Sequence, residues 1–187
     1  PSTEDILAAV NDINADNIFV LPNNKNIVLA AQQAAQMCTD KKVYVVESVT
    51  IPQGISAMVA YMPTEDAESN LLAMQEAMSC VATGMATYAV RSTTIDGQDI
   101  SEGDYLFMVD GGINNVDTDM ESGLKKLVAD MIAANEDAGI ATIFYGADVT
   151  ERDAQRLTDD FAQQYEDIEF ELHYGGQSVY YYIVSVE

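Results

Sequence analysis

The chain has 187 residues and a mass of 20.3 kDa, enough for one large domain or two small ones with a real core. Its 8 Lys and Arg against 31 Asp and Glu give a net charge of −23, so nucleic acid and anionic membranes are not expected partners. Apolar residues make up 48% of the chain, and no apolar run reaches the roughly 18 to 20 residues of a membrane span.

The first half of the chain alternates helical and strand patterns. Thr3 precedes an acidic first turn and apolar residues at helical spacing, which predicts a capped helix. The elements expected after it are a strand at 17–21, a helix at 26–37, a strand at 42–47, and helices at 55–62 and 64–81. This order predicts a parallel sheet with right-handed crossovers.

After about residue 82 the pattern changes to strands with turn signals. The expected elements are strands at 86–95 and 104–112, a helix at 121–138, a strand at 141–147, a helix at 151–165 capped by Thr150, and two final strands joined by a turn at Gly175 and Gly176. Two turn signals lie in residues 95–104, one of them at Asp96-Gly97. We therefore predict an α/β protein of two packed lobes: a parallel three-layer lobe at 1–82 and a mixed-sheet lobe at 83–187.

Two cysteines, Cys38 and Cys80, each end a helical pattern and lie far apart in sequence. They predict buried free thiols rather than a disulfide or a metal site. Free thiols fit a reducing compartment, and nothing at the start resembles a signal peptide, so we expect a cytoplasmic protein.

A polar segment, Pro22 to Asn26, separates the first strand from its helix. There the carboxyl end of a strand meets the amino end of a helix, where free N–H groups favour an acceptor-rich ligand. Asn24 alone could cap the helix, leaving Asn23, Lys25 and Asn26 as donors. The alternative is a cap with solvated neighbours.

Pro52, Gln53 and Gly54 follow the second strand in the same way. If the two strands are neighbours, Asn23, Lys25, Gln53 and Gly54 converge at one edge of the sheet, where ligands bind in open parallel sheets. The alternative is that Pro52 and Gly54 only shape a turn.

Other candidates in the second half are weaker. Arg91 lies in a predicted strand and suits either a salt bridge or a carboxylate or phosphate ligand. His173 is the only histidine and has no recognisable catalytic partner. Gly146 and Asp148 form a further strand-to-helix corner with a weak signal, and Asp110-Gly111-Gly112 indicates a turn rather than a nucleotide-binding loop.

Four segments in fixed order carry a family resemblance: LPNNKNI, TIPQGISA, TGMATYAVRSTTIDGQDISEGD and HYGGQSVYYYIVSVE. From about residue 16 to 187 the chain resembles the carboxyl-terminal region of bacterial DAK2-domain proteins, which are related to dihydroxyacetone kinase and form the ATP-binding subunit of fatty acid kinase. The resemblance implies an amino-terminal kinase domain that holds ATP and Mg²⁺, and a carboxyl-terminal domain that engages a DegV-family fatty-acid-binding protein. The bound fatty acid is then phosphorylated to acyl phosphate, for phospholipid metabolism. It also suggests a layout like that of the DegV proteins themselves.

No aspartate-rich nucleotide motif of a kinase domain occurs here, so we expect this chain alone to be no kinase and to hold no cofactor or metal. The resemblance implies functional roles for Asn23, Asn24, Lys25, Asn26, Pro52, Gln53, Gly54 and Arg91, without telling whether they contact partner, ligand or each other. One alternative is a domain that binds dihydroxyacetone or a similar small molecule, with a covalent adduct at His173. Another is a structural domain that makes the longer protein a homo-oligomer.

The acid excess has two interpretations. It provides solubility, or it forms an acidic face that docks a basic protein surface.

Overall fold

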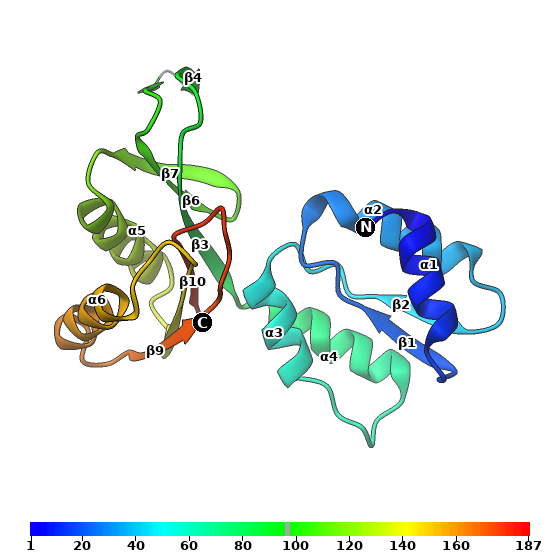
Figure 1. Ribbon diagram of the computed structural model, residues 1–187. Helices are drawn as coiled ribbons and strands as arrows, with labels where there is room; N and C mark the ends of the chain where they lie inside the picture. The colour runs from blue at the N-terminus through cyan, green and yellow to red at the C-terminus, as the bar shows by residue number, and fades with distance from the viewer. Residues whose placement is uncertain (96–97) are drawn as a thin grey trace. The chain divides into compact units, whose positions relative to one another are not determined.

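The computed structural model describes residues 1–95 and 98–187, which form two units, Pro1–Val81 and Ala82–Glu187 (Figure 1). Each unit has its own sheet and its own core. The turn predicted at Asp96-Gly97 lies outside the described residues.

The first unit is built on two parallel strands that pair in register from Asn17 with Lys42 to Val20 with Val45. Its elements are α1 (Thr3–Asp12), β1 (Asn17–Val20), α2 (Lys25–Met37), β2 (Lys42–Val45), α3 (Ile51–Val59) and α4 (Ala67–Ser79).

The alternation of side chains along β1 produces three layers. Ile18 and Val20 point into a core formed with α1 and α2, which includes the buried Val10 and Ala31. Phe19 and the following Leu21 belong to the opposite core, formed with α3 and α4. The predicted parallel, three-layer first lobe is therefore confirmed.

Polar caps fix where these helices begin. Ser2, rather than the predicted Thr3, caps α1 through a reciprocal capping box with Asp5. Asn24 caps α2 as predicted, since its side chain accepts a hydrogen bond from the N–H of Asn26. Thr50 caps α3, so the helix starts at Ile51 instead of residue 55. Pro52 fits there because the N–H groups of a first turn have no helical acceptor.

The second unit is a six-stranded mixed sheet in the order β7-β6-β3-β10-β8-β9, with a separate two-stranded antiparallel sheet of β4 and β5. Its elements are β3 (Ala82–Tyr88), β4 (Thr93–Ile95), β5 (Gln98–Ile100), β6 (Tyr105–Val109), β7 (Gly112–Asp117), α5 (Met120–Ala134), β8 (Ile140–Tyr145), α6 (Glu151–Gln164), β9 (Glu169–Tyr174) and β10 (Tyr182–Val186).

Helices α5 and α6 contribute to one core on the sheet (Figure 1). Helix α5 can approach the sheet closely because two glycines lack side chains at the contact. A Cβ on Gly84 of β3 would lie 2.5 Å from the sulfur of Met131, and one on Gly123 of α5 would lie 2.0 Å from the ring of Phe107. The mixed α/β architecture predicted for this half is confirmed.

The structure differs from three local predictions: the pairing of the last two strands, the segment after the turn at Asp110, and the burial of the two cysteines. β9 and β10 do not form a hairpin: β8 lies between them, parallel to β9 and antiparallel to β10. The turn at Asp110 and Gly111 is confirmed, with φ angles of 49° and 86°, but it leads into β7, a strand that was not predicted. Cys38 is only half-buried and Cys80 is exposed, because both lie at helix ends.

No helix in the described ranges is both long and apolar enough to cross a membrane.

Candidate functional site

The two strand-to-helix corners of the first unit meet, because β1 and β2 are parallel neighbours. The residues that join them are Asn23, after β1, and Ser48, after β2. The N–H of Asn23 donates to Ser48 Oγ at 3.2 Å, and the Ser48 hydroxyl donates to Asn23 Oδ1 at 2.7 Å. Ser48 is fully buried, so this pair satisfies a hydroxyl that would otherwise be costly to bury.

Gly54 of α3 completes this contact. A Cβ at position 54 would lie only 2.0 Å from Asn23 Oδ1 and 2.6 Å from Asn23 Cγ, so the asparagine side chain occupies the space that a larger residue would need. Asn23 itself has a φ of 51°, a left-handed conformation that asparagine tolerates better than most residues. The corner therefore depends on an asparagine at position 23 and a glycine at position 54.

The other predicted residues of the corner have local roles in the structure. Asn24 is the exposed cap of α2, and Lys25 and Asn26 are exposed in the first turn of that helix. Pro52 is buried, and Gln53 uses its side-chain oxygen to accept a hydrogen bond from the N–H of Val49 at 2.9 Å. Within the described residues, no hydrogen bond connects Lys25 or Gln53 to Asn23.

A shallow groove of about 370 Å³ opens beside Asn23 and Gly54. The rest of its lining is apolar and comes from the end of β1 and from α3: Leu21, Ile55, Met58 and Val59. Val59 is 82% exposed and Met58 is 55% exposed, which is unusual for such side chains on adjacent positions. The groove thus offers apolar contact area next to one amide side chain.

This apolar lining was not among the predicted site residues, although the sequence contains a signal for it. Residues 48–64 contain no charged residue, in a chain where charged residues make up 21% of the total. Exposed apolar side chains continue beyond the groove at Ile51 and Met62. We call the exposed side chains of Ile51, Ile55, Met58, Val59 and Met62 the α3 apolar face.

Arg91 does not lie in a strand, contrary to the prediction. β3 ends at Tyr88, and backbone pairing continues only to Ala89, whose N–H donates to the carbonyl of Asp104 at 2.8 Å and whose carbonyl accepts from Gly103 at 2.9 Å. Arg91 is exposed between β3 and β4. It belongs to the second unit, whereas the other predicted site residues belong to the first.

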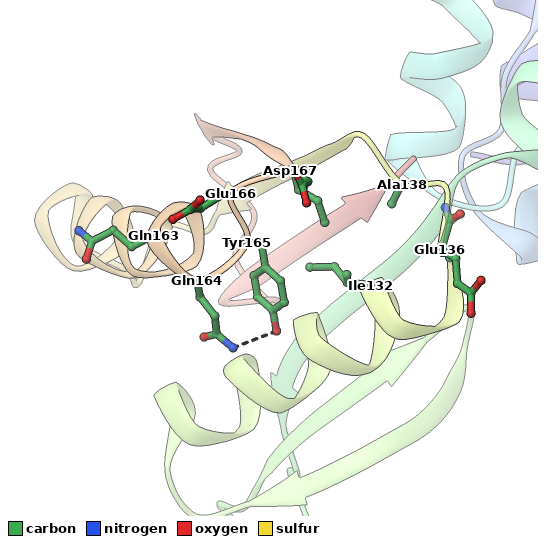
Figure 2. Close-up of a pocket in the computed structure, with 10 residues that line it drawn as sticks. Ile132, Glu136, Ala138, Gln163, Gln164, Tyr165, Glu166 and Asp167 are labelled. Atoms are coloured by element: carbon green, nitrogen blue, oxygen red, sulfur yellow. Dashed lines mark hydrogen bonds between the residues drawn. The ribbon is translucent and has the colours of Figure 1, made fainter.

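A second groove, of about 480 Å³, lies where α5 and α6 end (Figure 2). Its lining includes the acids Glu136, Glu166 and Asp167, and Gln164 donates a hydrogen bond to the Tyr165 hydroxyl at 3.2 Å. Helix carboxyl termini carry partial negative charge, which adds to that of the three acids. The groove therefore favours cationic over anionic groups.

The second unit offers little for catalysis in the part of the chain that is described. His173 is exposed, stacks on Phe144 at a ring distance of 5.8 Å and lies 3.3 Å from the Glu171 carboxylate. Among the described residues, no group of three or more His, Cys, Asp or Glu side chains could hold a metal ion. The Asp110-Gly111-Gly112 turn joins two strands, so it lacks the helix amino terminus that a phosphate loop requires. These residues do not fit a site for ATP and Mg²⁺.

The family model for the C-terminal domain of FakA-like fatty acid kinase subunits matches residues 1–187. The chain belongs to this family. Protein YloV of Bacillus subtilis (strain 168) is 44% identical over 187 residues, which are 100% of this chain and 33% of that protein. The chain thus spans about a third of the length of the curated relatives it matches. The family predicted from the four sequence segments is confirmed.

Solved structures show the same fold at low sequence identity. A DegV-family protein from Ruminococcus gnavus aligns with a TM-score of 0.68 at 13% identity, covering 100% of this chain and 77% of that one. The fatty acid kinase B3 protein of Streptococcus pneumoniae, solved with linoleic acid, aligns with a TM-score of 0.71 at 12% identity, covering 100% and 76%. The predicted DegV-like layout is therefore confirmed as a fold.

Proposed function

We propose that this domain docks a DegV-family fatty-acid-binding protein, so that a kinase domain outside this chain phosphorylates the bound fatty acid to acyl phosphate. The observation that carries the proposal is the match of the whole chain to the C-terminal domain of the FakA-like family of fatty acid kinase. ATP and Mg²⁺ belong to the kinase domain in this scheme, and the role of the domain is recognition.

The α3 apolar face supports a docking role. Apolar side chains that are exposed on α3, and just after it at Met62, are costly to leave in water, and a partner that covers them gains binding energy. The helix carries no charge that would have to be desolvated on binding. Asn23 and Gly54 hold the base of the groove in one shape, which reduces the entropy lost on association.

In this scheme the catalytic centre belongs to the kinase domain, and this domain contributes by docking. Phosphoryl transfer depends on placing the attacking carboxylate in line with the γ-phosphoryl group, and the protein contributes mainly position and charge neutralisation. A domain that holds the carrier converts an encounter in solution into one at high effective concentration. The domain would therefore act on the rate of transfer without touching ATP.

Calorimetric titration of this chain with the DegV-family protein of the same organism tests the proposal. We expect a saturable complex, and Val59→Glu, which places a charge on the α3 apolar face, should weaken it by about tenfold or more. The matched control is Leu72→Glu: Leu72 is 67% exposed on α4 and lies outside the groove lining. This control introduces the same charge and should change affinity by less than about twofold.

Absence of a complex with the unaltered chain would contradict the docking function. A complex that is equally sensitive to both substitutions would contradict the assignment to the α3 apolar face.

A further inference from the structure

Three tyrosines form a contiguous patch at one end of the six-stranded sheet. Tyr88 of β3 lies directly opposite Tyr105 of β6 in the strand register. The ring of Tyr181, just before β10, lies 5.7 Å from that of Tyr105 at an interplanar angle of 83° and 6.1 Å from that of Tyr88 at 59°. We call these three residues the tyrosine patch. Tyr88 is 43% exposed, whereas Tyr105 and Tyr181 are partly buried and pack against the core, so the patch opens to solvent mainly at Tyr88.

Backbone contacts hold the patch in place. The N–H of Tyr181 donates to the carbonyl of Ala86 at 2.9 Å, and the carbonyl of Tyr181 accepts from Gly146 at 2.8 Å. The hydroxyl of Thr87 donates to the carbonyl of Val179 at 2.8 Å. The segment that carries Tyr181 is therefore fixed against β3, and a ligand would meet rings that are already ordered.

Two carboxylates lie near the patch. Asp117 of β7 lies opposite Tyr105 in the register of β6 and β7. The N–H of Asp119 donates to this carboxylate at 2.9 Å, and that hydrogen bond lowers the pKa of Asp117 below its ordinary value. Asp148 is exposed and lies two residues after Gly146, whose N–H donates to the carbonyl of Tyr181 at 2.8 Å. Burial first, and then Tyr105, Asp148 and Tyr88, raise the pKa of Tyr181, which keeps its phenol neutral.

Aromatic faces with carboxylates nearby suit a planar cation. A guanidinium stacks on tyrosine rings, gains from their negative faces and at the same time donates hydrogen bonds to carboxylates. An anion would be repelled by the two aspartates, and an uncharged side chain would gain nothing from their negative charge. Tyrosine also loses little conformational entropy on binding, which makes it a common binding hot spot.

We propose that the tyrosine patch, together with the nearby Asp117 and Asp148, binds an arginine side chain presented by the docked carrier protein. This inference rests on the proposed docking function and names a recognition element within it. A protein-borne arginine fits better than a free small cation, because the patch is open to solvent rather than enclosed. The charge of −23 favours a partner whose contacting surface is basic.

Titration of the intact chain with the DegV-family protein tests the proposal through paired substitutions. Tyr88→Leu retains an apolar side chain and removes the aromatic face, and should weaken binding about tenfold. Tyr88→Phe retains the face and should bind within about twofold of the unaltered chain. Asp148→Asn should weaken binding about threefold or more. Circular dichroism and thermal unfolding of each variant establish that it is folded.

The outcomes separate this inference from the docking function. If the unaltered chain binds the carrier and Tyr88→Leu binds equally well, the inference is overturned while docking stands. If the unaltered chain does not bind the carrier, docking fails, and the patch is then tested by NMR with N-acetyl-arginine amide against the uncharged N-acetyl-citrulline amide. Ring-proton shifts at Tyr88 and Tyr181 with arginine alone support the inference, and equal or absent shifts with the two probes overturn it.

Discussion

At the scale of single residues, the first unit depends on the contact of Asn23 with Ser48 and Gly54. Three features meet there: a left-handed asparagine, a fully buried hydroxyl and a helix position without a side chain. Each requires the others, because moving the amide away from α3 would break its hydrogen bond with the buried Ser48. The groove beside α3 takes its shape from this contact.

Gly54→Ala should destabilise the first unit by about 1–2 kcal/mol, although alanine is normally the better helix former by about 1 kcal/mol. The new Cβ would meet Asn23 Oδ1 at 2.0 Å, and displacing that side chain leaves the Ser48 hydroxyl with only its longer contact, 3.4 Å, to the carbonyl of Val46. Urea unfolding measures the change. In an Asn23→Gly background, where glycine suits the φ of 51°, the same Gly54→Ala substitution should no longer destabilise. Equal costs in both backgrounds would show that the contact is unimportant.

The roles of these residues are only partly predictable from sequence. Asn24 as a cap and the meeting of the two corners follow from local chemistry and from the parallel order of β1 and β2. Gln53 departs from the prediction, since its side chain bonds to the backbone at its own helix start. The burial of Ser48 is not predictable, because nothing in the sequence shows that a serine after a strand will be buried against an asparagine 25 residues earlier.

At the scale of elements, an ion network connects α5 to α6. Glu121 accepts hydrogen bonds from Arg156 of α6 at 2.6 Å and from Lys125 of its own helix at 2.7 Å, and Asp160 lies 3.3 Å from Lys125. Arg156 first, and then Lys125, lower the pKa of Glu121 from 4.5 to about 2. The network therefore couples the packing of the two helices to pH.

Glu121→Gln should lower the free energy of unfolding by about 0.5–1 kcal/mol at pH 7, because the network is partly exposed to solvent. The folded pKa lies below the unfolded one, so the contribution of Glu121 is complete above about pH 4.5 and is lost as pH falls towards 2. Urea unfolding at pH 7 and pH 3 should therefore show a smaller difference between variant and parent at pH 3. Glu151→Gln, in the first turn of α6, is the control for a lost helix-terminal charge. A difference that is the same at both pH values would contradict the assignment.

The pairing of elements is harder to predict than their existence. The Gly175-Gly176 turn signal is local and favours a hairpin, yet β8 inserts between β9 and β10, because strand order depends on burial contributed by α5 and α6. Helix α3 starts earlier than predicted, since its proline lies in a first turn, which accepts it, rather than before the helix. Arg91 lies outside a strand, although the strand-like sequence pattern continues past Tyr88, since backbone pairing in the sheet continues only to Ala89.

At the scale of the whole molecule, charge is unevenly distributed between the two units. Residues 82–187 carry 21 of the 31 acidic residues and five of the eight Lys and Arg residues. Both the tyrosine patch and the acidic groove at the ends of α5 and α6 belong to this part of the chain. For the proposed docking, we therefore expect long-range attraction to act mainly through the second unit and the α3 apolar face of the first unit to provide short-range contact.

This division of roles predicts how docking responds to salt. The association rate constant with the DegV-family carrier should fall about tenfold or more between low salt and about 0.5 M salt, because exposed charges are then screened within a few ångströms. The dissociation rate constant should change much less, since the apolar contact on α3 is not screened. Stopped-flow measurements over a salt series give both constants.

Val59→Glu should raise mainly the dissociation rate constant and leave the salt dependence of the association rate constant nearly unchanged. Asp148→Asn should reduce that salt dependence. An association rate constant that does not depend on salt would contradict electrostatic steering. The net charge of −23 would then be interpreted as a contribution to solubility alone.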